Sequence, residues 1–288
     1  MKHPTHKWQF RRHFRTNAYG WSASKLASKR LKEALSEIKK VRRSDPVAAA
    51  EGSVLLMEKL WPALAHVDTS SGALGRAVSN TVHILIDIFL SAPMDAKQRE
   101  EWLERLWQAI EDDGVDYLRD LRERWGELCE SPEDASRRAD EFLPVLHMSW
   151  SGESSWYYNG TPACLSCLLV AGRYQELMDL IENAPLLWWH FRRYGVEALR
   201  AQGKTDEAVE YALASQGLND SWVVIAKKCE EILLEAGRGD EAYRRFAFDA
   251  NQAGTYLATL RALVKKYPWK EPRGILDDLI KSSPFDPG

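Results

Sequence analysis

One interval recurs in the second half of the chain: a glycine, three mostly polar residues, a glutamate, and then a small or apolar residue. It runs from Gly172 to Leu177, from Gly203 to Ala208 and from Gly237 to Ala242, with the glycines 31 and 34 residues apart. An apolar segment with helical spacing precedes each glycine. Glycine readily adopts the left-handed conformation that ends a helix, and the polar residues that follow begin the next one. The interval therefore predicts antiparallel helix hairpins.

The rest of the chain also has helical punctuation. Asp45-Pro46, Ser131-Pro132 and Thr161-Pro162 each pair a capping residue with a proline at the first helical position. No sustained period-two alternation suggests a strand. We therefore expect an all-α fold with no β-sheet and about fourteen helices, near residues 22–43, 46–66, 70–91, 95–112, 115–130, 132–149, 162–171, 173–183, 185–202, 205–215, 221–236, 240–252, 255–267 and 272–282.

The three glycine intervals resemble tetratricopeptide-type (TPR) repeats and related α-solenoids over residues 162–253. The interval at Gly172 is the weaker match, and Gly195 lies eight residues before Gly203, where seven is usual. The resemblance implies a right-handed α-α superhelix, because one hairpin cannot bury its apolar face alone and neighbouring hairpins must stack. A generic helix-hairpin repeat is the safer form of this prediction.

The whole chain also resembles an uncharacterised bacterial family of helical-repeat proteins. The resemblance lies in four stretches, at residues 49–52, 68–73, 217–221 and 265–268. It supplies no activity, but it implies that chains of this kind continue past Gly288, so that this one is a shortened form.

Two regions are expected. Residues 1–150 would form a basic N-terminal arm and a bundle of long helices, and residues 151–288 would form the TPR-like hairpins, with the loop 149–160 between them. One continuous superhelix fits the sequence equally well.

Charge is divided unevenly along the chain. Residues 1–43 carry thirteen Lys and Arg and two acids, a net charge of +11, whereas the other 245 residues have a net charge of −14. Within this arm, aromatic and basic residues interleave. One interpretation is a nucleic-acid-binding segment that uses Lys7, Arg11, Arg12, Arg15, Lys25, Lys29 and Arg30.

The alternative interpretation of the arm is structural. Its aromatic residues would cap the open core of the first hairpin, and its cations would keep that end of the molecule solvated; these rings are Trp8, Phe10, Phe14, Tyr19 and Trp21. An anionic membrane surface or an acidic protein is a further possible partner of the cations.

A second aromatic and basic cluster lies where the hairpins begin. Aromatic residues and Arg are typical anchors of protein interfaces, so we predict a partner-binding face formed by Trp156, Tyr157, Trp189, Arg192, Arg193 and Tyr194. Trp188 and Trp189 point about 100° apart on a helix, so one could be buried while the other reaches a groove. Packing between the hairpins is the alternative role of these aromatic residues.

No local pattern indicates enzyme chemistry. Cys164-x-x-Cys167 has no second pair to complete a zinc site, so these thiols are expected in the core. We predict no catalytic residue, metal or cofactor. The apolar run at 83–90 is too short for a membrane span, and no secretory signal is apparent. Reduced cysteines favour the cytoplasm, although the Arg-rich start overlaps in composition with a mitochondrial presequence.

The sequence as a whole favours a non-enzymatic scaffold that binds a protein or peptide on a concave surface built from the hairpins. A nucleic-acid-associated protein that uses the basic arm is the second hypothesis. The third is an enzyme or toxin-type activity without a recognisable motif.

Overall fold

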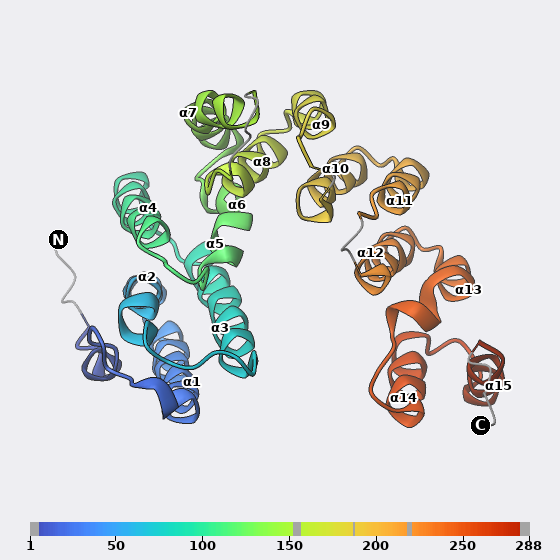
Figure 1. Ribbon diagram of the computed structural model, residues 1–288, viewed down its shortest axis with the longest axis horizontal. Helices are drawn as coiled ribbons and strands as arrows, with labels where there is room; N and C mark the ends of the chain where they lie inside the picture. Colours follow the sequence, from blue (N-terminus) through green and yellow to red (C-terminus); the bar gives the residue numbers. More distant parts are fainter. Residues whose placement is uncertain (1–5, 152–156, 187, 218–220, 283–288) are drawn as a thin grey trace. The chain divides into compact units, whose positions relative to one another are not determined.

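The computed structural model describes residues 6–151, 157–186, 188–217 and 221–282, and every regular element in these ranges is helical (Figure 1). The all-α prediction is therefore confirmed for the described part of the chain. The chain divides into two compact units, Met1–Ala171 and Gly172–Gly288.

Unit 1 begins with two short 3-10 helices, η1 (Gln9–His13) and η2 (Trp21–Ala23). Its α-helices are α1 (Ser24–Arg42), α2 (Pro46–Leu64), α3 (Ala73–Leu90), α4 (Ala96–Glu111), α5 (Arg119–Glu123), α6 (Trp125–Leu128), α7 (Pro132–Trp150) and α8 (Thr161–Val170).

Unit 2 contains seven described helices, which are shorter than α1, α2 and α3 of unit 1. They are α9 (Tyr174–Glu182), α10 (Trp189–Ala201), α11 (Thr205–Ala214), α12 (Trp222–Glu235), α13 (Gly239–Ala250), α14 (Tyr256–Lys266) and α15 (Pro272–Ser282).

The division between the units lies after α8, whereas the sequence suggested a division near residue 150. The reason is that α8 packs against α5, α6 and α7. Its side chains are buried along nearly the whole helix, from Thr161 to Leu168. The apolar residues that looked like the first half of a hairpin thus contribute to the core of unit 1.

The predicted helix at 115–130 is two short helices, α5 and α6, interrupted at Arg124. Gly126, shortly after this interruption, is in close contact with α8. A Cβ at this position would lie 2.3 Å from the backbone oxygen of Ser166, so α6 lies directly on the backbone of α8. The Gly126 amide donates to the Ser166 hydroxyl at 3.0 Å.

Two of the three predicted N-caps are confirmed. Asp45 accepts a hydrogen bond from the Ala48 amide at 2.9 Å, and Ser131 accepts one from the Asp134 amide at 3.2 Å. Thr161 does not act as a cap, because α8 begins at Thr161 itself and Gly160 precedes it without a side-chain cap.

Among the described helices, α3 is long and apolar enough to cross a membrane by length and composition. It carries the apolar run noted in the sequence. Its buried residues, such as Val78, Val82 and Leu85, are completely enclosed within unit 1, where α3 packs against α1 and α2. Core helices of folded proteins share this length and composition.

Glycines follow the ends of α8, α10 and α12, as predicted. Gly172, Gly203 and Gly237 have φ angles of 71°, 74° and 74°, in the left-handed region. Gly203 joins α10 to α11 and Gly237 joins α12 to α13, and both helix pairs pack together. The third pair, α14 and α15, turns at residues 267–271, where Pro272 begins the second helix.

The first helices of successive pairs, α10, α12 and α14, follow one another in Figure 1. Ion pairs connect α10 to α12: Lys228 Nζ lies 2.9 Å from Glu197, and Arg200 Nη1 lies 3.3 Å from Glu231. Partly exposed pairs of this kind add little free energy. They do establish which side chains of neighbouring hairpins face each other.

The second helices form the other row, α11, α13 and α15. Arg238, at the start of α13, pairs with Asp206 of α11. Tyr243 of α13 donates a hydrogen bond to Asp278 of α15 at 3.0 Å, and burial followed by this bond raises the pKa of Tyr243 to about 12. Each helix thus meets its counterpart in the next pair.

One charged side chain of α12, Glu230, is completely buried. Its carboxylate accepts hydrogen bonds from the Tyr267 hydroxyl and from Asn251 Nδ2, the latter at 2.6 Å, and it pairs with Lys266. Burial, and then the bond to Glu230, raise the pKa of Tyr267. This network joins α12 to the end of α14, because a buried carboxylate requires partners on every side.

Replacing Glu230 with alanine is expected to destabilise unit 2. The substitution leaves the buried Tyr267 hydroxyl without its acceptor, whereas the Lys266 ammonium is 37% exposed and is solvated by water, so the free energy of unfolding should fall by about 1–3 kcal/mol. Urea denaturation followed by circular dichroism measures the change. Glu231→Ala, at the neighbouring half-buried position, removes only partly exposed ion pairs; it is the matched control and should cost about 1 kcal/mol or less. Equal losses in the two variants would contradict the assigned role of Glu230.

Candidate functional site

Four aromatic rings of the N-terminal arm pack against one another in sequence. Successive ring centroids lie 5.4 Å apart for Trp8 and Phe10, 6.3 Å for Phe10 and Phe14, and 6.2 Å for Phe14 and Tyr19. All four side chains are buried, whereas Trp21 is 71% exposed. The four rings therefore serve as a cap on the core and are not available to stack on bases.

Three contacts hold the arm on α1 and α2. Glu37 of α1 accepts hydrogen bonds from the backbone amides of Gln9, at 2.8 Å, and Phe10, at 3.1 Å. The ring of Trp8 lies directly over α2, where a Cβ at Gly52 would be only 2.3 Å from it. Farther along, the Asn17 amide donates to the Pro62 carbonyl at 2.8 Å. The arm is thus attached near both ends of α2.

Between these attachments lies an open hollow of about 500 Å³. Its lining combines arm residues with one residue of α2: Lys7, Trp8, Gln9, Arg11, Arg12, Phe14, Arg15 and Lys59. Four of the cations predicted to bind nucleic acid meet here. Lys59 was not predicted, because only the tertiary contact of the arm with α2 brings it to the others. We call Lys7, Arg11, Arg12, Arg15 and Lys59 the basic hollow.

The three remaining predicted cations lie elsewhere. Lys25 and Lys29 line a separate hollow of about 330 Å³ with Lys32 of the same helix. Arg30 is paired with Glu33 at 2.7 Å. Near it, burial, followed by the charges of Arg30 and Arg12, lowers the pKa of His13.

The described residues of the predicted partner-binding face belong to two units and differ in exposure. Trp156 lies outside the described residues, and Tyr157, which is 51% exposed, belongs to unit 1. In unit 2, Trp189 and Tyr194 are buried in the core, so they cannot supply the open contact area assigned to them.

The two predicted arginines of this face are held by aromatic neighbours. Arg192 lies over the ring of Tyr211 at 5.3 Å and within 3.5 Å of Glu182. Arg193 lies over the ring of Tyr194 at 4.9 Å and donates to its hydroxyl at 3.2 Å. These two ring contacts lie within the hairpin of α10 and α11, whereas the alternative raised from the sequence was packing between hairpins.

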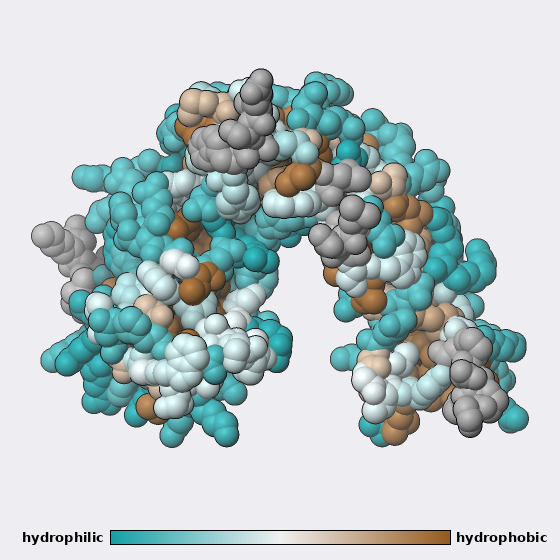
Figure 2. Space-filling view, in the orientation of Figure 1, coloured by the Kyte–Doolittle hydropathy of each residue, from teal (hydrophilic) through white to brown (hydrophobic). Residues whose placement is uncertain are grey.

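Exposed aromatic residues instead occur at the start of each first helix. Trp188, Trp222 and Tyr256 are 40%, 36% and 48% exposed and lie exactly 34 residues apart. They precede or open α10, α12 and α14. We call these three residues the aromatic row. The visible face of unit 2 is otherwise mainly hydrophilic, with separated hydrophobic residues (Figure 2).

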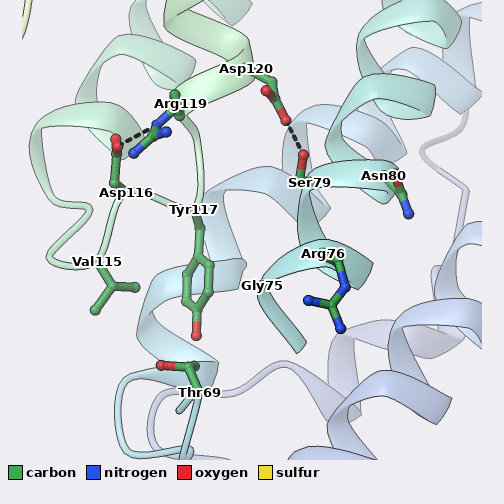
Figure 3. A pocket seen from close by; sticks show the side chains of 10 residues that line it. All are labelled: Thr69, Gly75, Arg76, Ser79, Asn80, Val115, Asp116, Tyr117, Arg119 and Asp120. Atoms are coloured by element: carbon green, nitrogen blue, oxygen red, sulfur yellow. Dashed lines mark hydrogen bonds and ion pairs between the residues drawn. The ribbon is translucent and has the colours of Figure 1, made fainter. Parts of the chain in front are cut away.

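Another hollow, of about 520 Å³, lies in unit 1 between the start of α3 and the segment around α5 (Figure 3). Its acids are already paired. Asp116 lies 2.9 Å from Arg119 and also pairs with Arg122, and the Ser79 hydroxyl donates to Asp120 at 2.6 Å. The Ser79 hydroxyl donates to this carboxylate and not to the imidazole of His83, which lies 3.6 Å from the other oxygen of Asp120. The geometry supports a structural role for these groups.

The four cysteines are buried, in agreement with the core role predicted for Cys164 and Cys167. A hydrogen bond with Cys167 lowers the pKa of Cys129, and that bond, together with burial, raises the pKa of Cys167. Burial raises the pKa of the Cys229 thiol to about 11. No group of three or more His, Cys, Asp or Glu side chains in the described ranges could hold a metal ion.

Comparisons with protein-family models, with curated proteins and with solved structures found no match for this chain.

Thiol labelling should separate the cysteines by burial and pKa. In the native protein at pH 8 we expect Cys129 to react first with a disulfide reagent, because it is 8% exposed and has the lowered pKa. Cys229 should remain unreactive until the pH approaches 11 or the chain unfolds. Absorbance of the released thiolate measures the rates, and Cys129→Ala identifies the first phase. A fast phase that persists in that variant would be inconsistent with this order.

The Cys229 shift also predicts a loss of stability at alkaline pH. The folded state keeps the thiol proton that the unfolded state releases above its ordinary pKa of about 8.5. The contribution of the protonated Cys229 thiol to the free energy of unfolding is therefore fully present below about pH 8.5 and is lost as the pH rises toward 11.

The contact between Gly52 and Trp8 can be tested by adding one methyl group. Gly52→Ala should displace the Trp8 ring and loosen the arm, at a cost of about 1–3 kcal/mol. Faster tryptic cleavage within residues 6–15 measures the loosening. Gly75→Ala in α3 is the matched control, since nothing lies within 4 Å of its Cβ, and should be neutral or stabilise by up to about 1 kcal/mol. Unchanged cleavage in Gly52→Ala would disprove the docked arm.

Proposed function

We propose that unit 2 is a TPR-like array of helix-hairpin repeats that holds an extended peptide segment of a partner protein. The support is a common 34-residue offset. It relates Gly203 to Gly237, the starts of α11 and α13, and the members of the aromatic row. A stack of such hairpins would form a right-handed superhelix of the kind found in α-solenoids.

The aromatic row is the observation that carries this proposal. Helices of one row run in the same direction, because each is followed by an antiparallel partner. In the proposed array their N-terminal ends would lie at one edge of the unit, together with Trp188, Trp222 and Tyr256, which precede or open these helices. Exposed aromatic side chains at equal intervals offer one contact point for each hairpin.

The spacing of this row limits what it can bind. Packed helices lie about 8–10 Å apart, and an extended chain advances about 3.3 Å per residue. One hairpin therefore corresponds to about three residues of an extended peptide. A suitable ligand presents bulky apolar side chains at every third position, each packed beside one aromatic ring.

Buried residues give the row its rigid base. Next to Trp188, the side chain of Trp189 is 8% exposed and belongs to the same core as Ile225 and Cys229 of α12. Trp222 Nε1 donates to Asp249 at 2.8 Å, which fixes the orientation of its indole. A preorganised aromatic surface loses little conformational entropy on binding. Reduced, buried thiols suit a cytoplasmic location, which we propose as well.

Peptide selection tests this function. A displayed library of random peptides should yield sequences with apolar residues three positions apart. For a selected peptide, Trp188→Ala, Trp222→Ala and Tyr256→Ala should each weaken binding by about tenfold or more, equivalent to at least ~1.4 kcal/mol. Fluorescence anisotropy with the labelled peptide gives the dissociation constants.

The matched control is Ile280→Ala. Ile280 is also apolar and 52% exposed, but it lies on α15, in the row of second helices. Its replacement should leave the affinity unchanged. A selected peptide that binds all three variants of the aromatic row as tightly as the original chain would refute the proposed site.

A further inference from the structure

The basic hollow of unit 1 brings together five positively charged side chains that have no acidic partner within the described residues. Many other arginines in the described ranges have acidic partners; Arg105, for example, lies 2.7 Å from Glu58. In the same ranges, none of the five cations of the basic hollow forms an ion pair with an acid, and no acidic residue lines it. Like charges held around one cavity repel each other, and a bound anion would remove that repulsion.

The nearby acids are engaged in other contacts. Glu58 precedes Lys59 in α2, but Arg105 of α4 binds both of its oxygens, at 2.7 and 2.8 Å. Glu37 accepts the amides of Gln9 and Phe10. Both carboxylates are thus engaged by other groups and neither lines the basic hollow, so its charge is left without an acidic partner.

The cations are also held in position. Arg11 and Arg12 lie in the 3-10 helix η1, between the buried rings of Phe10 and Phe14. Lys59 comes from the separate helix α2, seven residues after the glycine on which Trp8 rests. Side chains from two elements therefore converge on one cavity, which distinguishes this site from a flexible basic tail.

We infer that the basic hollow binds the phosphate backbone of a double-stranded nucleic acid. Arginine guanidinium groups match phosphate oxygens with two parallel hydrogen bonds, and three of the five cations are arginines. The neighbouring rings Trp8 and Phe14 are only 6% and 1% exposed. Because they cannot stack on unpaired bases, the site recognises the backbone and not the base sequence.

The second hollow of the same unit adds three cations that could contact further phosphates of a polymer: Lys25, Lys29 and Lys32. A duplex offers phosphates at regular intervals along its length, whereas a small phosphate compound would occupy the basic hollow alone. This inference concerns unit 1 and does not depend on the peptide site proposed for unit 2.

The test measures binding of the full chain to a fluorescent duplex, in separate DNA and RNA arms, between about 50 and 200 mM salt. The five cations of the basic hollow should by themselves contribute about −4 to −5 to the slope of log affinity against log salt. Arg11→Ala/Arg12→Ala/Arg15→Ala should weaken binding at least tenfold and reduce the slope by about three. Lys59→Ala should reduce it by about one.

Two control variants separate the basic hollow from general charge. Lys97→Ala removes one exposed cation of α4 and should leave binding unchanged. Gly52→Ala removes no cation but displaces the arm from α2, so it should weaken duplex binding. Circular dichroism confirms that each variant keeps its helical content. If Lys59→Ala and Lys97→Ala have equal effects, or if Gly52→Ala has none, the assignment to the basic hollow is overturned.

The ligand class is tested with three further probes. A single strand of the same length should bind no more tightly than the duplex, and binding of the single strand alone would overturn the inference. Vesicles containing an anionic phospholipid and an oligoglutamate peptide should bind more weakly than the duplex. The chain could instead bind the vesicles or the peptide, fail to bind the duplex, and lose that binding in Arg11→Ala/Arg12→Ala/Arg15→Ala. That result would reassign the hollow to a lipid surface or an acidic protein.

Discussion

A single helix hairpin leaves an apolar face exposed to water unless a neighbouring segment covers it. This constraint applies to both units. Inside unit 2 each hairpin covers the next, as the shared core from Val196 to Leu279 illustrates. At an open end, another segment must take the place of the missing neighbour. In unit 1 the N-terminal arm does so, by inserting Trp8, Phe10 and Phe14 over α1 and α2. At the end of unit 2, Leu276 and Ile280 of α15 remain exposed on the described chain.

Close approach between these elements depends on small residues at a few positions. Gly126 lets α6 lie on the backbone of α8, and Gly52 receives the ring of Trp8. Gly195 occupies the site where Tyr211 crosses α10, since a Cβ there would lie 2.8 Å from the tyrosine ring. Its counterpart one hairpin later is Cys229, which is completely buried. The glycines that end helices and those that permit contact thus have separate physical roles.

The sequence predicted the helices and their glycine turns well, because periodicity and left-handed glycines are local properties. It was less informative about which face of a helix is buried. Trp188 and Trp189 were expected to diverge, and they do, but the exposed member is Trp188. That choice depends on where α10 begins and on what packs against it. Lys59 and Glu230 were missed for the same reason, since only distant contacts, with the arm and with Tyr267, give them their roles.

The two interpretations of the basic arm from the sequence, a cap or an anion-binding segment, do not exclude each other in the structure. The turn of η1 directs the rings of Phe10 and Phe14 inward and leaves Arg11, Arg12 and Arg15 exposed. Burying the rings fixes the backbone, and the fixed backbone holds the cations beside Lys59. The hydrophobic free energy of the cap therefore supplies the preorganisation that an anion site requires. Loss of the cap should disperse the cations even though every charge is still present.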